Sequence, residues 1–231
     1  MYAKIFKRPI DFLLSLIAVI VLTPVFIILI AVGTAAMKGS PFFTQLRPGK
    51  ISKKTGEEKI FRLIKFRTMT CEKDKAGNFL PDEKRLTKYG KFLRSTSLDE
   101  LPELINILKG DMSIIGPRPQ LVRDMVFMTE QQRLRHKVRP GLSGLAQING
   151  RNAIKWENKL AYDLEYIEKI TFFADMRIIF QTVVKVFKRA DISEDGMETA
   201  EDFGDYLLRI GSVSKDEYEN LQSEAKELIK A

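Results

Sequence analysis

Two adjacent carboxylates, Asp99 and Glu100, have the type and setting needed for chemistry on a phosphate. They follow Arg94 and open a segment with the signature of a helix N-terminus, where exposed N–H groups and the helix dipole favour a bound anion. A carboxylate there could attack phosphorus, or coordinate Mg²⁺, which prefers oxygen ligands. Alternatively, the two acids only stabilise the helix dipole, because acidic side chains favour a first turn.

Basic side chains elsewhere are candidates for holding the phosphates of such a substrate. Arg118 stands between two prolines, and a planar guanidinium on a stiff turn can bind phosphate with little loss of entropy. A buried structural ion pair is the alternative for Arg118. Lys65 and Arg151 are further phosphate candidates, although each alone could be an ordinary surface charge. Asp163 could bind a metal or a ribose, or be an exposed acid on a helix.

The single cysteine and the single histidine exclude several classes of site. With Cys71 alone, the chain can form neither an internal disulfide framework nor a cysteine-based structural zinc site. His136 alone excludes a metal site with two imidazoles, and its place in a basic run indicates a surface or structural residue. The sequence contains no P-loop, no GxGxxG unit, and no RNP-like or helix-turn-helix signature. We therefore expect no nucleic-acid partner.

An uncharged segment from Phe12 to Met37 precedes all of these residues. Its 26 residues would extend roughly 39 Å as a helix, more than the ~30 Å hydrocarbon core of a bilayer. The segment is too long for the apolar region of a typical signal peptide. It could therefore cross the bilayer, or enter one leaflet, break and return. Thr23 and Pro24 favour the second path, because proline frees a carbonyl and kinks a helix while the threonine hydroxyl can bind a freed carbonyl.

The positive charge of the chain is concentrated around this segment. The formal net charge of +8 is the sum of +9 in residues 1–70, +7 in residues 71–189 and −8 in residues 190–231. Lys7 and Arg8 precede the apolar segment, and further lysines and arginines follow it. Positive flanks give a spanning helix no preferred orientation, whereas a returning helix would place both flanks at the cytoplasmic face. From charge and length alone, both paths remain open.

The remaining periodicity predicts short strands followed by helices. Strands are expected near residues 41–49 and 60–69, with a loop over 71–84. An apolar stripe from Leu101 to Leu108 predicts one helix that begins at Ser97 or Asp99 and ends at Gly110. Further helices are expected over residues 86–93, 121–135, 156–169, 178–187 and near the C-terminus.

Motifs in a fixed order carry a resemblance to a known family. They are Lys7-Arg8, Thr23-Pro24, Phe43-Thr-Gln-Leu-Arg-Pro-Gly49, Lys65-Phe-Arg-Thr-Met69, Arg94-Ser-Thr-Ser-Leu-Asp-Glu-Leu-Pro102, the segment from Asn106 to Pro119, and the segment from His136 to Arg151. The match runs from about residue 1 to residue 203. The chain thereby resembles the monotopic bacterial phosphoglycosyl transferases, the bacterial sugar transferase family, in its small form.

The resemblance implies a reaction and a set of site residues. A UDP-sugar and undecaprenyl phosphate would give undecaprenyl-diphosphate sugar and UMP. Asp99 matches the family's nucleophile, which would carry a covalent phosphosugar, and Glu100 completes the acidic dyad. Mg²⁺ would lie near Asp99 and offset phosphate charge. The positions that the family associates with phosphate, nucleotide or active-site structure are Lys65, Arg94, Arg118, Arg151 and Asp163.

The resemblance also implies a location and a division of the chain. Residues 1–38 would form a re-entrant membrane helix-break-helix, residues 39–190 the catalytic domain, and residues 191–231 an acidic C-terminal extension. Thr23 and Pro24 match the family's break, and Lys7 and Arg8 would lie near the phospholipid headgroups. We expect an α/β fold, mostly helical with little strand, at the cytoplasmic face of a bacterial inner membrane.

The resemblance also suggests a sugar donor, and it is weighed against functions other than catalysis. It suggests an N-acetylated amino sugar such as UDP-N,N′-diacetylbacillosamine as donor, in N-glycan or polysaccharide assembly, and it leaves a homodimer open. A non-catalytic membrane-anchored protein that binds through basic patches is the alternative function. The intact acids Asp99 and Glu100 favour the enzyme. A nucleic-acid-binding function would not explain the uncharged segment from Phe12 to Met37.

Overall fold

The computed structural model describes residues 1–150, 154–188 and 201–230. Its elements run in the order η1 Tyr2–Phe6, α1 Lys7–Met37, β1 Phe42–Ile51, β2 Glu58–Phe66, α2 Asp82–Arg85, α3 Lys88–Thr96, η2 Leu98–Glu100, α4 Glu103–Lys109, β3 Ser113–Ile115, α5 Val122–Met125, α6 Glu130–Arg133, η3 Leu134–Lys137, β4 Gly141–Ser143, α7 Leu145–Ile148, α8 Trp156–Glu168, α9 Phe172–Lys188, α10 Phe203–Arg209 and α11 Lys215–Lys230. The described chain is mostly helical, with an antiparallel β1–β2 pair and a parallel β3–β4 pair. The expected fold class is confirmed.

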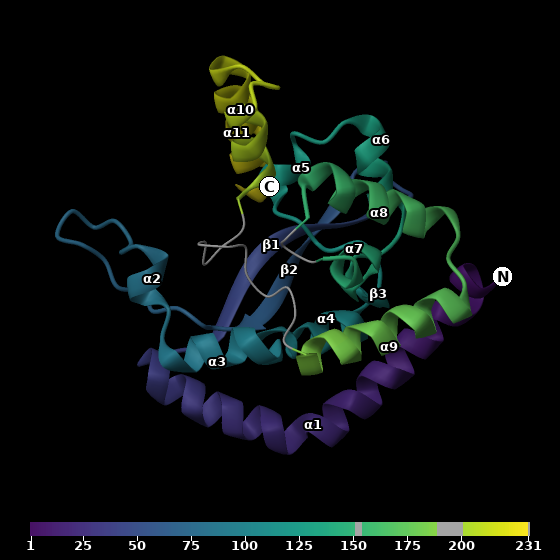
Figure 1. Ribbon diagram of the computed structural model, residues 1–231, viewed down its shortest axis with the longest axis horizontal. Coiled ribbons are helices and arrows are strands. Elements are labelled where there is room, and N and C mark those ends of the chain that lie inside the picture. The colour runs from purple at the N-terminus through teal and green to yellow at the C-terminus, as the bar shows by residue number, and fades with distance from the viewer. Residues whose placement is uncertain (151–153, 189–200, 231) are drawn as a thin grey trace.

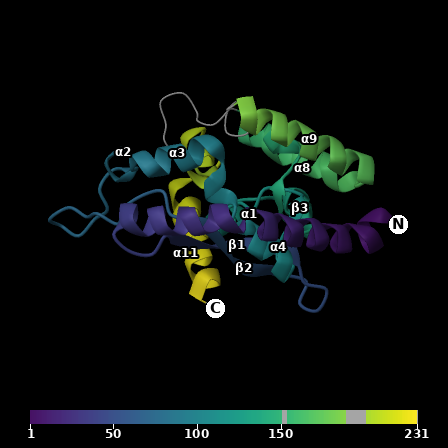
Figure 2. The same ribbon diagram turned by 90° about the horizontal axis from the view of Figure 1, so that it is seen from below.

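Helix α1 lies along one side of the molecule, and α3, α4 and α9 lie above it (Figure 1). Figure 2, seen from below, shows α1 crossing beneath the rest of the chain. Both halves of α1 contribute to apolar cores with other elements. Ala18, Val19 and Leu22 pack against a cluster that contains Ile107 of α4. Farther along, Leu29 is buried with Phe66 of β2 and Leu93 of α3.

The predicted break at Pro24 is a bend within one continuous helix rather than an end of the element. Helix α1 runs through Pro24, and its ribbon curves so that both ends turn toward the rest of the molecule (Figure 1). The Thr23 hydroxyl donates to the carbonyl of Val19 over 2.8 Å. Pro24 removes the helical donor to the carbonyl of Ile20, so this bond to Val19 is an ordinary i−4 side-chain bond beside the bend and does not satisfy the freed carbonyl. The re-entrant path through a bilayer stays a prediction.

Polar contacts fasten the N-terminal end of α1 to the globular part. Lys7 forms a buried ion pair of 2.6 Å with Asp175 of α9, and Asp11 accepts a hydrogen bond of 2.5 Å from Ser113 of β3. Arg8 donates over 2.6 and 2.9 Å to carbonyls in the last turn of α4, where a cation also complements the helix dipole. The structure therefore uses Lys7 and Arg8 inside the protein, and their predicted contact with headgroups stays a prediction.

Strand β2 is held between β1 and α4, which fixes the position of its last residues. Phe42 pairs with Phe66, and the register shifts between Pro48 and Ile51. On the α4 side, the buried amide of Asn106 accepts from the N–H of Ile64 and donates to the carbonyl of Arg62, over 3.1 and 2.8 Å. The side chain thus pairs with a strand edge as a neighbouring strand would.

Two helices predicted from periodicity are divided in the structure. The segment expected as one helix up to Gly110 is the 3₁₀ turn η2 followed by α4, because Pro102 lies between them without a donor. The segment 121–135 is divided into α5, α6 and η3, because Thr129 and Gln132 form a reciprocal capping box that starts a new helix. Local capping here outweighs the apolar periodicity.

The described part of the C-terminal extension, residues 201–230, contains helices α10 and α11 and packs against α5 and α8. Phe203 of α10 is buried beside Trp156 of α8 and Phe127 in one apolar cluster. Helix α11 contributes Tyr218 and Leu221 to the same cluster. The acidic tail expected from composition is thus a docked pair of helices, which lie at the edge of the molecule opposite α1 (Figure 1).

Candidate active site

The acidic dyad lies on the short 3₁₀ turn η2, between α3 and α4. Ser97 enters the left-handed region, with φ of 56°, which is uncommon for a residue other than glycine and costs of order 1 kcal/mol. This backbone turn ends α3 after Thr96 and redirects the chain, so that Asp99 and Glu100 face the end of β2. A strained residue two positions before a pair of carboxylates is typical of a functional site.

Cations from two other elements meet Glu100. Its Oε1 lies 2.8 Å from Lys65 Nζ on β2 and 2.9 Å from a guanidinium nitrogen of Arg118. Glu103, at the start of α4, is also 3.2 Å from Lys65 Nζ. The structure therefore brings together four predicted residues, Asp99, Glu100, Lys65 and Arg118, and adds Glu103.

The surrounding charges shift the pKa values of Glu100 and Glu103 in opposite directions. Burial opposes ionisation of Glu100, but Lys65 and Arg118 outweigh it and hold the pKa of Glu100 below its ordinary value. Burial and the charge of Glu100 raise the pKa of Glu103 to about 7, despite Lys65. Glu100 is thus the fixed anion that holds both cations, and Glu103 is a group that titrates near neutrality.

Asp99 differs from Glu100 because its carboxylate is not engaged. Among the described residues no hydrogen bond or ion pair involves it, and its side chain is half-buried. Burial and the neighbouring Glu100 raise the pKa of Asp99, while Lys65, Arg94 and Arg118 act in the opposite direction. An accessible carboxylate surrounded by cations is suited to meet a phosphate as nucleophile or to share a metal ion with it.

Helix α3 positions Arg94 at the same cluster. Thr87 caps the helix by accepting from Gly90 N–H over 2.9 Å, and Arg94 Nε donates to Thr68 Oγ1 over 3.2 Å. Gly90 lets α3 approach the chain after β2 closely, since a Cβ there would be 1.9 Å from the carbonyl oxygen of Thr68. That close approach keeps Arg94 near Asp99.

The turn that carries Arg118 is held from behind by two further arginines. Arg135 donates to the Arg118 carbonyl over 2.6 Å and forms a buried ion pair of 2.5 Å with Asp163 of α8. Arg47 of β1 donates to the carbonyl of Pro119 over 3.0 Å. Asp163, predicted to contact substrate, therefore supports the Arg118 turn through Arg135, although its Oδ1 is buried without a partner among the described atoms.

Some predicted residues fall outside this cluster. Arg151 lies outside the described residues, so its predicted phosphate contact is left as a prediction. Lys7, Arg8, Thr23 and Pro24 belong to α1, as described above. His136 is buried and its Nδ1 is 3.0 Å from Glu58, which makes it structural rather than a surface residue.

Sequence reasoning missed Glu103, Arg135 and Arg47. Glu103 follows Pro102 in a helix start, where an acid is expected for the dipole alone. Arg135 lies in a basic run that suggests a solvated surface, yet it is among the largest fully buried side chains. Only their contacts across the fold reveal these roles, and no spacing in the sequence signals them.

The residues present fit a magnesium ion that is completed by substrate. No group of three or more acidic, histidine or cysteine side chains in the described part of the chain could hold a metal ion alone. Mg²⁺ is commonly bound by one or two carboxylates together with substrate phosphates and waters. The unengaged carboxylate of Asp99 fits that arrangement, whereas Glu100 is already bound to Lys65 and Arg118.

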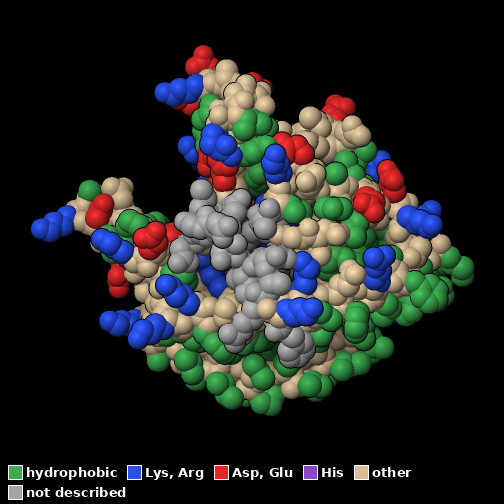
Figure 3. Space-filling view, in the orientation of Figure 1, with side chains coloured by type: hydrophobic (Ala, Val, Ile, Leu, Met, Phe, Trp, Pro, Cys, Tyr) green, Lys and Arg blue, Asp and Glu red, His purple; other side chains and the backbone are tan. Residues whose placement is uncertain are grey.

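An apolar face lies on the side of α1. Within the described chain, Tyr2–Met37 is the helical stretch long and apolar enough to cross a membrane, by length and composition alone. Hydrophobic side chains follow the lower margin of the molecule over α1 (Figure 3). Exposed hydrophobic residues on this helix include Phe12, Leu13, Ile17, Ile20, Val21, Ile27, Ile28 and Val32. Phe92 of α3 and Phe173 and Phe180 of α9 are also exposed.

Comparison with known proteins gives matches over most of the chain. A family described as bacterial sugar transferase matches residues 2–189. An uncharacterised sugar transferase of Bacillus subtilis, EpsL, is 50% identical over 179 residues, which cover 77% of this chain and 86% of that protein. Exopolysaccharide production protein ExoY of Sinorhizobium fredii is 33% identical over 197 residues, 78% of this chain and 84% of that protein.

A larger protein with a named reaction also matches. The UDP-glucose:undecaprenyl-phosphate glucose-1-phosphate transferase of Klebsiella pneumoniae is 40% identical over 193 residues, which cover 79% of this chain. The match covers only 40% of the Klebsiella protein. The extension beyond residue 189 lies outside the family match.

Proposed function

The chain belongs to the bacterial sugar transferase family and is a transferase, and from that premise we propose that it moves the phosphosugar of a UDP-sugar to undecaprenyl phosphate. The products are undecaprenyl-diphosphate sugar and UMP. The observation that carries the proposal is the unengaged carboxylate of Asp99 within a cluster that contains Lys65, Arg94 and Arg118. That arrangement suits a diphosphate substrate, because cations stabilise the charge of its phosphates while a carboxylate approaches phosphorus.

The chemistry divides into two displacements at phosphorus. In the first, an oxygen of Asp99 bonds to the sugar-bearing phosphorus, the bridging P–O bond breaks, and UMP leaves with the bridging oxygen. In the second, a phosphate oxygen of the lipid bonds to the same phosphorus and the bond to Asp99 breaks. Neither step needs an added oxidant or reductant, and the carboxylate is regenerated. Separate displacements predict ping-pong kinetics.

The other cluster residues bind and orient the donor. Arg118 and Lys65 offer N–H donors to the diphosphate from a turn and a strand, and Glu100 fixes both of them by direct contact. Arg94 approaches from α3. Mg²⁺, held by Asp99 and substrate phosphates, would supply charge neutralisation at the diphosphate.

The expected site of action is a membrane surface, since both the apolar α1 and the named lipid substrate of relatives suggest membrane association. Because both halves of α1 pack against the same globular part, we place both ends on one side of the bilayer, the cytoplasmic one. A second copy of the chain is not needed for the cluster described above.

Two kinds of UDP-sugar are candidate donors. UDP-glucose is the donor named for the Klebsiella relative, whereas the motif resemblance suggests an N-acetylated amino sugar. The experiment measures UMP release by the purified protein in nanodiscs with Mg²⁺, a panel of both kinds of UDP-sugar, and undecaprenyl phosphate present or absent.

We expect lipid-dependent UMP release with one donor and, without lipid, a phosphosugar adduct seen by intact mass. Asp99→Asn should lose both while its thermal unfolding midpoint stays near that of the wild type, because the change removes the nucleophile and keeps the shape. Folded wild-type protein that gives neither UMP nor adduct with any donor would favour the non-catalytic membrane-anchored binder.

A further inference from the structure

The C-terminal extension is joined to the segment that directly follows the Arg118 turn. Asp124 of α5 accepts the N–H of Phe203 on Oδ1 over 2.9 Å and the N–H of Leu121 on Oδ2 over 3.0 Å. One carboxylate thus binds the first residue of α10 and the residue before α5. Asp202, next to Phe203, forms an ion pair with Arg123, which lies on α5 beside Asp124.

Apolar packing strengthens this junction. The rings of Trp156 and Phe203 are 5.0 Å apart, and those of Phe127 and Tyr218 are 5.5 Å apart. Gly204 lies so close to Phe127 that a Cβ there would be 2.5 Å from its ring. These contacts place α10 and α11 over α5 and the start of α8 with little spare room.

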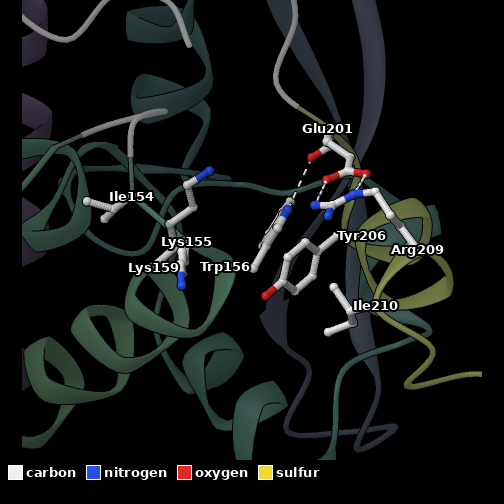
Figure 4. A pocket seen from close by; sticks show the side chains of 8 residues that line it. All are labelled: Ile154, Lys155, Trp156, Lys159, Glu201, Tyr206, Arg209 and Ile210. Atoms are coloured by element: carbon white, nitrogen blue, oxygen red, sulfur yellow. Dashed lines mark hydrogen bonds and ion pairs between the residues drawn. The ribbon is translucent and has the colours of Figure 1, made fainter. Parts of the chain in front are cut away.

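Figure 4 shows the α8 side of the junction, where Trp156 lies beside Tyr206 and next to the ion pair between Glu201 and Arg209. The indole N–H of Trp156 donates to the carbonyl of Glu201 over 3.1 Å. The extension is therefore fixed by backbone and side-chain hydrogen bonds as well as by packing, which a loosely attached tail would lack.

From this junction, one electrostatic interaction and two direct contacts lead to the cluster around Asp99. The buried guanidinium of Arg47 donates to the carbonyl of Pro119, next to Arg118, and the charges of Asp124 and Asp202 act favourably on it. Arg118 in turn contacts Glu100. Contacts to Pro119 and Leu121 thus hold the chain that directly follows Arg118, on the side where the extension docks.

We propose that Asp124 is a positioning residue for Arg118, and that residues 201–230 act as an internal brace which holds the Arg118 turn in its phosphate-binding position through Asp124 and Arg47. This inference rests on the proposed function. It assigns a role to a segment outside the family match. The brace acts on a side chain that contacts the donor, so its loss should change donor use rather than stability alone.

Two variants undock the extension from opposite sides. Gly204→Val introduces side-chain atoms against Phe127 without touching Asp124, and Asp124→Asn removes one of the two hydrogen-bond acceptors. Asp205→Asn is the matched control, because Asp205 bonds only Tyr218 within the extension among the hydrogen bonds seen. The readouts are KM for the UDP-sugar, kcat for lipid-dependent UMP release, and the thermal unfolding midpoint of the full chain in nanodiscs.

We expect both undocking variants to lower kcat/KM for the donor by between about twofold and about thirtyfold, the range typical of coupling between connected sites. Most of the change should be in KM, and Asp205→Asn should match the wild type. In an Arg118→Lys background, Gly204→Val should add little further loss, because the residue it acts through has already changed. Equilibrium binding of UMP gives the same comparison if turnover of Arg118→Lys is too low to measure.

Other outcomes overturn the inference. Undocking variants with wild-type kcat/KM and a lowered unfolding midpoint would make the extension a purely structural element. An equal loss from Gly204→Val with Arg118 and with Lys at that position would exclude action through Arg118. Activity of the wild type and of Asp205→Asn separates these results from failure of the proposed function, in which no variant releases UMP.

Discussion

Glu103 gives the catalytic cluster a charge that can change at physiological pH. Its carboxyl is 3% exposed and 3.2 Å from Lys65 Nζ, so it shares that ammonium with Glu100. Burial and the charge of Glu100 raise its pKa from 4.5 to about 7. Below about pH 7 Glu103 is neutral, and above it the carboxylate adds negative charge beside the proposed diphosphate site.

We predict that Glu103→Gln removes the alkaline fall in kcat/KM for the donor. In the wild type, kcat/KM should fall about three- to tenfold as pH rises through about 7, because the ionised Glu103 repels the donor phosphates. The neutral glutamine cannot ionise, so its profile should stay flat there. The measurement is the pH profile of UMP release, with Glu130→Gln, on exposed α6, as the control.

The pH dependence of the free energy of unfolding is an independent test of whether Glu103 titrates near pH 7. The folded pKa of Glu103 lies above its ordinary value, so the folded protein binds this proton more tightly than the unfolded chain does. Its contribution to stability therefore falls as pH rises from about 4.5 to about 7, and Glu103→Gln should remove that part of the fall. Parallel profiles of wild type and variant, in both kinetics and unfolding midpoint, would refute a titration of Glu103.

At the scale of elements, the proposed membrane contact of α1 has a topology that can be tested. We predict that cysteines placed at Ala3 and Ser40, on either side of α1, face the same compartment, because both ends of the helix are tied to one globular part. Cys71 is exposed and must first be changed to Ser. A membrane-impermeant maleimide should label neither position in intact spheroplasts and both after lysis.

The control for this experiment is Thr55→Cys, on the exposed turn between β1 and β2, which reports the side of the catalytic domain. Labelling of one end of α1 in intact cells, with the other protected, would show a helix that crosses the bilayer. That result would require the contacts of Arg8 or Leu29 with the globular part to be broken in the membrane.

Elements whose pattern is local were predictable from the sequence, and those set by distant contacts were not. The strands β1 and β2 and the helices α8 and α9 follow their alternation or periodicity. The break between η2 and α4 was not anticipated, because it lies at Pro102, which the first turn of one continuous helix would also tolerate. Ser97 can cap a helix as readily as it can end one, so its type alone does not decide.

The site residues also divide into those that the local sequence indicates and those that only distant contacts reveal. Asp99, Glu100, Lys65 and Arg118 could be selected because acids beside cations on stiff turns suit a phosphate. Asp163 was expected to touch substrate, yet the structure pairs it with Arg135 behind Arg118. A buried arginine within a basic run carries no sequence signal of its partner, since only the packing of α8 brings Asp163 to it.

At the scale of the whole molecule, the apolar face and the catalytic cluster impose different requirements on the two half-reactions. In the proposed reaction the UDP-sugar donor is water-soluble and reaches Asp99 without a membrane, whereas the lipid acceptor must be met at the bilayer. The exposed rings of Phe173 and Phe180, at 83% and 70% exposure, lie on α9, which the Lys7–Asp175 ion pair joins to the N-terminal end of α1. An aromatic ring placed in the membrane contributes on the order of 1 to 3 kcal/mol of binding.

We therefore predict that the double variant Phe173→Ser and Phe180→Ser separates the half-reactions. The phosphosugar adduct on Asp99 should form from UDP-sugar at the wild-type rate, because no residue of the cluster has changed. Lipid-dependent turnover in vesicles that contain undecaprenyl phosphate should fall at least about tenfold, together with vesicle binding measured by flotation. Phe79→Ser is the control, because Phe79 is 55% exposed but lies on the arm before α2, flanked by Lys73 and Arg85. Equal loss of adduct formation and turnover would show that α9 supports the catalytic fold, and unchanged turnover would place the membrane contact on α1 alone.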